Sequence, residues 1–162
     1  MPRPNINDIQ LTPSVLDRLI DDRPGISQQL ASSRAAGLRE LKQAVRRDLE
    51  WLLNTRQVVG GVPPELKELS NSVAAYGVPD FTALSIRNPA DQQHMQRELE
   101  NAIATFEPRL EDVSVVLEPP DDDPTVLRFR IDARLRVEPS PEPVTFDTTL
   151  QTHSGAFTIR GD

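Results

Sequence analysis

Apolar residues recur at intervals of three and four over the first two thirds of the chain and at every second position over the last third. Side chains three and four residues apart share one face of a helix, whereas alternate side chains share one face of a strand. The period changes at Phe106-Glu107-Pro108-Arg109, where the proline prevents a helix from continuing. The pattern predicts an α+β fold, in which N-terminal helices precede a small antiparallel β-sheet packed against them.

Three helices are predicted between Leu38 and this change of period. The longest is expected from Leu38 to Arg56 and a shorter one from Glu65 to Ala75. A third begins at Asn88-Pro89, because asparagine caps a first turn and proline fits the first helical position. The residues expected to face the core are, in order, Leu38, Leu41, Val45, Leu49, Leu52, Leu53, Leu66, Leu69, Val73, Met95, Leu99, Ala102, Ile103 and Phe106.

Strands are predicted near residues 113–117, 127–137, 144–150 and 157–159. The second alternates most regularly, and its polar face carries Arg128, Arg130, Arg134 and Arg136. Such a basic stripe could bind nucleic acid or an acidic protein, or it could pair with acidic residues on adjacent strands, such as Asp147 and Glu118. No aromatic residues interleave with the arginines for base stacking, which disfavours nucleic acid.

The composition narrows the classes of protein that the chain can belong to. Its 162 residues suit a single core. With 18 basic and 25 acidic residues the formal net charge is −7, which again argues against a nucleic-acid partner. The lack of cysteine excludes disulfides and thiolate metal sites. No apolar run suits a signal peptide or direct membrane insertion, so a cytoplasmic location is expected.

The N-terminal region is expected to dock through a short helix on a tether. Residues 21–37 are polar and end in a glycine, which predicts a tether, so we divide the chain into a docking segment at 1–37 and one domain at 38–162. Thr12-Pro13 predicts a helix start ahead of the tether. A helix shorter than about 12 residues is unstable alone, so it must dock on its own domain or on a partner. The apolar residues on its predicted face are Val15, Leu16, Leu19 and Ile20.

The polar side of the first long helix carries a second candidate contact. Arg47 lies one turn before Trp51, a spacing that allows a cation–π contact. Arg46 and Glu50 lie at neighbouring positions, and a plain solvated face is the simpler interpretation. With Val15, Leu16 and Leu19, Arg47 and Trp51 form the set of possible partner-binding residues.

Glu107, Pro108 and Arg109 are the main candidate site. The proline fixes a carboxylate and a planar guanidinium in one relation, which suits docking on another protein better than bond-breaking chemistry. On this interpretation Arg109→Ala leaves the fold intact and weakens assembly with a partner by roughly 2 to 5 kcal/mol.

Catalytic and cofactor signals are weak. His94 and His153 have no neighbours at metal-ligand spacing, and Gly60-Gly61 lacks the context of a phosphate loop. Glu107 could join an aspartate in glycoside hydrolysis, but the adjacent Arg109 favours its ionised form, whereas a general acid must hold a proton. We therefore expect no enzymatic activity, no metal and no cofactor.

Four runs in order carry a resemblance to a known family: PSVLDRL at 13–19, RRDLEWLLNTR at 46–56, SVAAYGVPDF at 72–81 and EPR at 107–109. They closely resemble the TssE family, the small baseplate wedge subunits of bacterial type VI secretion systems. That family is related to the lysozyme-like wedge protein of contractile phage tails. The resemblance covers nearly the whole chain.

The resemblance implies an assembly role. Family members bind the TssF and TssG subunits at the Glu-Pro-Arg motif, which makes Glu107, Pro108 and Arg109 the expected wedge-binding residues. They also offer their sheet as a template for the TssB/TssC sheath, and TssK is a further candidate partner. We expect the strand near residues 144–151 or the last strand to supply the accepting edge. The alternatives are a peptidoglycan hydrolase and a wedge subunit of a related phage-tail-like contractile particle.

Overall fold

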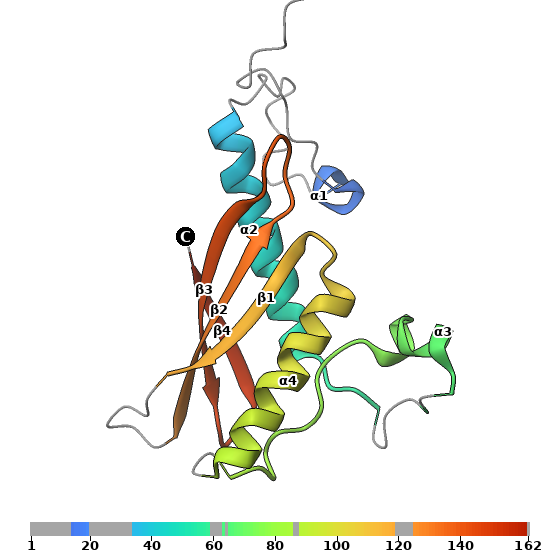
Figure 1. The fold of residues 1–162 in the computed structure, drawn as a ribbon, viewed down its shortest axis with the longest axis vertical. Helices are drawn as coiled ribbons and strands as arrows, with labels where there is room; N and C mark the ends of the chain where they lie inside the picture. The colour runs from blue at the N-terminus through green and yellow to red at the C-terminus, as the bar shows by residue number, and fades with distance from the viewer. Residues whose placement is uncertain are drawn as a thin grey trace, which may run out of the picture.

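A computed structural model describes residues 14–19, 34–58, 63, 65–85, 88–118 and 125–161. Two long helices lie against a four-stranded antiparallel sheet, so the predicted α+β class is confirmed (Figure 1). The elements are α1 (Val15–Leu19), α2 (Arg34–Asn54), α3 (Lys67–Ser70), the 3-10 helix η2 (Val73–Ala75), α4 (Pro89–Phe106), β1 (Leu110–Leu117), β2 (Val126–Leu135), β3 (Glu142–Gln151) and β4 (Ala156–Gly161).

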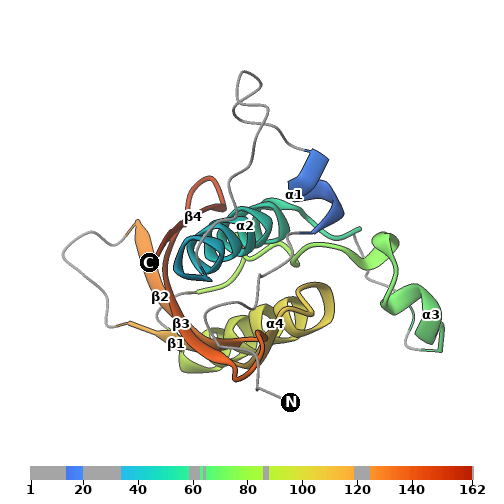
Figure 2. The ribbon, with the colours of Figure 1, turned by 90° about the horizontal axis from the view of Figure 1, so that it is seen from above.

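The sheet has the order β1-β2-β3-β4, so each strand pairs with its neighbour in the sequence. Figure 2 shows α2 and α4 on one face of the curved sheet, with α2 in contact with β4 and α4 in contact with β1. The alternation of β2 is as predicted, because Leu127, Phe129 and Ile131 are buried in the core. β3 pairs on both sides, so the expectation that residues 144–151 supply an open edge is wrong. β1 and β4 are the edge strands.

Helix α2 begins earlier than the sequence pattern predicts. It starts at Arg34 rather than Leu38, and Gly37 is buried within it. A glycine inside a helix costs only about 0.5–1 kcal/mol relative to alanine, which packing can offset. A hydrogen bond also holds the first turn, because Nη1 of Arg34 donates to the carbonyl oxygen of Glu138 at 2.5 Å. The last residues assigned to the polar tether therefore belong to the helix.

The segment between α2 and α4 also differs from the prediction. In place of one helix from Glu65 to Ala75 there are two short elements, α3 and η2, which contain no buried residue. Ser72 divides them, because its Oγ accepts a hydrogen bond from the backbone N–H of Ala74 and starts a new turn. Figure 1 shows α3 standing away from the main body. The three leucine and valine side chains expected to face inward are exposed: Leu66, Leu69 and Val73.

The chain returns to the core through a bend at Gly77. This glycine has a φ of +113°, and a Cβ atom there would lie 2.5 Å from the carbonyl oxygen of Thr55. Because no side chain intervenes, Val78 can donate from its N–H to that same oxygen at 2.9 Å. Val78 is buried, and its hydrogen bond ties the segment that follows η2 to Thr55, the residue directly after α2.

Helix α4 follows its predicted boundaries. Oδ1 of Asn88 accepts from the N–H of Ala90 at 3.1 Å, and Pro89 is the first helical residue. The helix ends at Phe106, and Glu107 is its C-cap. Its buried residues are Met95, Leu99, Ala102 and Ile103, which pack in one continuous core with apolar residues of α2 and of all four strands.

Candidate docking surface

The backbone of the corner after α4 is fixed on both sides. The N–H of Glu107 still donates to the carbonyl oxygen of Ile103 at 2.8 Å, which completes the last helical bond. Two residues later the carbonyl oxygen of Arg109 accepts from the N–H of Arg136 at 2.8 Å, which ties the corner to the segment after β2. Pro108 lies between them with its side chain exposed. The corner is thus a rigid junction between helix and sheet.

Glu107 is buried, with an exposed fraction of 4%. Its Oε1 accepts from Nε of Arg109 at 2.6 Å, and its Oε2 accepts from Nη2 at 2.5 Å. This two-point geometry matches the planar fork of a guanidinium to both oxygens of a carboxylate. A buried carboxylate needs a positive charge nearby to compensate it, and Arg109 of the same chain supplies that charge.

Arg109 also joins the corner to α2. Its Nη2 donates to Oδ2 of Asp48 at 2.6 Å, and Oδ1 of Asp48 accepts from Nε and Nη2 of Arg47 at 2.9 and 2.8 Å. The Cζ atom of Arg47 lies 5.0 Å from the ring centroid of Trp51, so the predicted cation–π contact is present. We call the alternating set Glu107, Arg109, Asp48 and Arg47 the charge row.

The charge row affects the ionisation of its neighbours. The hydrogen bond to Glu107 raises the pKa of Arg109 above its already high ordinary value, so this guanidinium stays cationic. Tyr76 packs its ring edge-on to Phe106, with centroids 5.3 Å apart. Burial raises the pKa of Tyr76, and the negative charges of Asp48 and Glu107 raise it further.

The structure brings five predicted site residues into one connected group: Glu107, Pro108, Arg109, Arg47 and Trp51. What they present differs from the expectation, because Glu107 is enclosed, whereas Trp51 is half exposed. Asp48 is the member that our sequence reasoning missed. It lies three residues after Val45 and four before Leu52, on the border of the apolar stripe, and a carboxylate at such a position needs a cationic partner.

The role of the candidate partner-binding residues of α1 stays a prediction. Val15, Leu16 and Leu19 of α1 are exposed, so the described structure does not bury them on their own domain. Their predicted companions Thr12, Pro13 and Ile20 lie outside the described residues, as do Gly60 and Gly61.

The basic face formed by β2 and by Arg136, which directly follows it, is largely neutralised by acidic side chains. Nε of Arg130 lies 3.0 Å from Oδ2 of Asp132, on the same strand. Arg134 and Arg136 reach acidic residues of β1, with Nη1 of Arg134 3.4 Å from Asp112 Oδ2 and Nε of Arg136 3.6 Å from Glu111 Oε2. Pairing with acidic groups is thus confirmed for three arginines, but the partners are not the Asp147 and Glu118 that we named.

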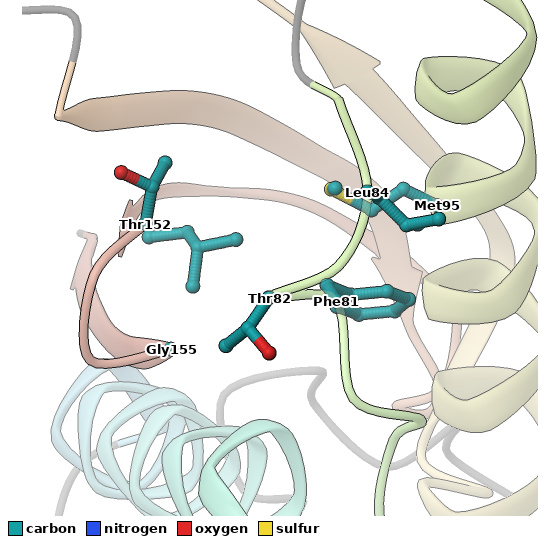
Figure 3. A pocket seen from close by; sticks show the side chains of 7 residues that line it. Phe81, Thr82, Leu84, Met95, Thr152 and Gly155 are labelled. Carbon is teal, nitrogen blue, oxygen red and sulfur yellow. The ribbon is translucent and has the colours of Figure 1, made fainter.

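The described part of the chain holds no group of three or more residues suited to a metal ion. His94 is exposed, with Nδ1 3.9 Å from Oε1 of Glu98, and His153 is exposed in the β3–β4 turn. A small pocket between α4 and that turn has apolar walls and two threonine hydroxyls but no titratable side chain (Figure 3). Its lining residues are Phe81, Thr82, Leu84, Met95, Leu150, Thr152 and Gly155.

Comparison with protein families identifies the class of this chain. Residues 39–140 match the family described as baseplate wedge protein gp25, and the chain belongs to that family. The matched region contains the whole charge row and ends in the turn between β2 and β3. Membership of this family supports the assignment of the chain as a structural subunit of a phage-tail-like baseplate. A search of curated proteins gave no match. In the described residues, every helix is too short or too polar to span a membrane.

Proposed function

We propose that this chain is the TssE-type wedge subunit of a type VI secretion baseplate. In this role it docks on TssF and TssG through the surface beside the charge row and offers its sheet to the first TssB/TssC sheath subunits. TssK is a further candidate partner, and the site of action is the cytoplasmic side of the inner membrane complex. The family match supports the baseplate class, and the four motifs of the sequence support the type VI assignment.

The observation that carries the docking part is the way the charge row holds Trp51. Arg47 donates two hydrogen bonds to Asp48, and its Cζ atom lies over the indole ring of Trp51. The half-exposed ring is therefore presented on a helix face that is already ordered. Tryptophan and arginine dominate the energetics of many protein interfaces, and ordering them before binding lowers the entropy cost.

Glu107 has an indirect part in this proposal. A buried carboxylate whose two oxygens are both held by Arg109 is not available to a partner without rearrangement. It acts by orienting Arg109, which in turn positions Asp48. The same enclosure does not suit a general acid, which must lie within hydrogen-bond reach of its substrate. We accordingly propose an assembly subunit without catalytic activity.

Trp51→Ala tests the docking surface. Loss of a central interface tryptophan costs about 2 kcal/mol or more, so affinity for a purified TssF/TssG complex should fall at least about 30-fold. The melting temperature should change little, because half of the side chain is already in solvent. Gln43→Ala, at another exposed position of α2, is the matched control and should bind as the wild type does. Unchanged affinity of the Trp51 variant in isothermal titration calorimetry would reject this surface.

A further inference from the structure

The outer edge of β4 is already occupied at one residue. Nδ2 of Asn54, in the last turn of α2, donates to the carbonyl oxygen of Phe157 at 2.9 Å. Its Oδ1 accepts from the N–H of Phe157, also at 2.9 Å. A carboxamide carries the same donor and acceptor pair as a peptide group. Asn54 therefore takes the place that one residue of a fifth strand would take.

Asn54 is itself held in position. Its Nδ2 also donates to the carbonyl oxygen of Glu50 at 2.8 Å, one helical turn earlier. Close by, Nη1 of Arg56 donates to the carbonyl oxygen of Leu53 at 3.1 Å, and Nη2 donates to that of Gly155. The chain at the end of α2 thus contacts β4 at Phe157, through Asn54, and the β3–β4 turn at Gly155, through Arg56, and these contacts hold the Asn54 side chain in place.

The contact defines which groups of β4 face outward. In an antiparallel pair, alternate residues direct their N–H and C=O groups toward the neighbouring strand. Phe157 directs both groups to Asn54, so Thr158 and Arg160 must be the residues that bond to β3, where they pair with Thr149 and Asp147. The next outward residue is Ile159, about 7 Å along the strand from Phe157.

The other edge of the sheet is less suited to a new strand. The N–H of Val115 in β1 donates to Oε1 of Glu100 on α4 at 2.8 Å. The pairing of β1 shifts register between Glu111 and Ser114, and Asp112 has a φ of +54°. A bulge of this kind twists an edge away from regular pairing. β4, by contrast, pairs with β3 in unbroken register from Phe146 to Gln151.

We propose that the edge of β4 from Ile159 to Gly161 accepts an extended segment of a second protein, and that Asn54 is the stop that fixes where this added strand ends. The inference rests on the proposed function of templating a sheath, and it names the acceptor residues and the device that sets their register. A slip of one residue directs every side chain of an added strand to the opposite face. A fixed stop at Phe157 prevents a slip in the direction of that residue.

The stop also protects the free protein. An unpaired edge strand is a template for pairing with a second copy, and proteins shorten such edges to prevent it. Because Asn54 satisfies Phe157, the free edge is confined to the end of β4. The same contact thus excludes a long, non-specific partner strand and admits a short one.

Amide hydrogen exchange with residue-level fragmentation tests the acceptor edge, using the whole chain alone and bound to TssB/TssC. In the free protein, the N–H of Ile159 should exchange at least about 10-fold faster than those of Phe157 and Thr158. In the complex, Ile159 should slow to the rate of Thr158, while Phe157 stays unchanged. Binding without any slowing at Ile159 would overturn the proposed edge. Failure of TssB/TssC to co-sediment with the chain would instead overturn the proposed function.

Asn54→Ala tests the stop. The N–H of Phe157 should lose its protection in the free variant and regain it in the complex, because the added strand can now extend to it. Asn101→Ala, which removes an exposed asparagine from α4, should behave as the wild type does. If Asn54→Ala does not fold, Asn54→Leu serves in its place, since leucine keeps a side chain of similar size but can neither accept from nor donate to Phe157. The Leu variant should likewise lose the protection of Phe157 in the free state. Protection of Phe157 that is independent of residue 54 would overturn the role of Asn54.

Discussion

Glu107 is buried where the chain turns from helix to strand, and Arg109 supplies the positive charge that compensates it. A charge withdrawn from water costs several kcal/mol unless a partner and hydrogen bonds accompany it. The motif therefore stabilises the corner before any partner binds. This changes the expectation for Arg109→Ala, which we had predicted from the sequence to leave the fold intact.

Removal of the Arg109 guanidinium should destabilise the protein. Breaking a buried pair by removing one partner costs about 3–5 kcal/mol, and the partial exposure of Arg109 places the effect at the lower end. Urea unfolding of Arg109→Ala should therefore show a loss of about 3 kcal/mol. Arg97→Ala, at an exposed position of α4, controls for loss of one positive charge and should change stability by less than about 0.5 kcal/mol. Equal stability of the two variants would contradict the compensating role of Arg109.

The pKa of Tyr76 gives a second test of the charge row, because two members of the row, Asp48 and Glu107, affect it. Burial and the negative charges of Asp48 and Glu107 raise its pKa above the ordinary value of 10.0. The folded state thus binds the phenolic proton more tightly than the unfolded state, so this stabilisation is complete below about pH 10 and is lost as the pH rises through the folded pKa. Tyr76 is the only tyrosine, so absorbance at the phenolate band isolates it. A midpoint at or below pH 10 would show that the local field is not as described.

At the scale of elements, the hydrophobic periods predicted both long helices and all four strands, because each buries a regular face against one core. The start of α2 and the break at Ser72 were not predictable in this way. They depend on Arg34 reaching Glu138 and on a local side-chain hydrogen bond. The candidate site was likewise predictable in part. Glu107, Arg109, Arg47 and Trp51 were found as separate motifs, but only the packing of α2 beside the corner reveals that Asp48 joins them.

The bend after η2 gives a test of local geometry. Gly77→Ala would place a Cβ 2.5 Å from the backbone oxygen of Thr55 at a φ of +113°, which should cost about 3 kcal/mol. At Gly155 the φ is +67°, and the nearest atom is the movable end of the Arg56 side chain, so Gly155→Ala should cost about 1 kcal/mol. Thermal unfolding should therefore rank the Gly77 variant as the less stable. The reverse order would be inconsistent with the described bend.

At the scale of the whole molecule, the helices cover one face of the sheet. On the other face, acidic side chains neutralise most of the described arginine charges of β2 and the residue after it. Arg130, Arg134 and Arg136 are paired with acidic groups, so this face is not a free cationic surface. With a formal net charge of −7, the molecule as a whole repels polyanions. Recognition is then expected at local features: the indole beside the charge row and the short free edge of β4.

A turbidity assay separates the assembly role from the hydrolase alternative. Purified wild-type protein should not clear a suspension of peptidoglycan, because the only carboxylate in the corner motif is enclosed and bonded to Arg109. A commercial lysozyme provides the positive control. Clearing by the wild type, and its loss in a folded Glu107→Gln variant, would establish muramidase activity and refute a purely structural role.

Helix α2 carries both Asp48 and Asn54. Along the helix axis these residues lie only about 9 Å apart, at 1.5 Å per residue. A tensile load applied to the edge of β4 is therefore transmitted to the corner through less than two turns of continuous hydrogen-bonded helix, with no loop in between. In the assembly that we propose, this short and stiff connection would let force pass from the sheath to the wedge without stretching the subunit between them.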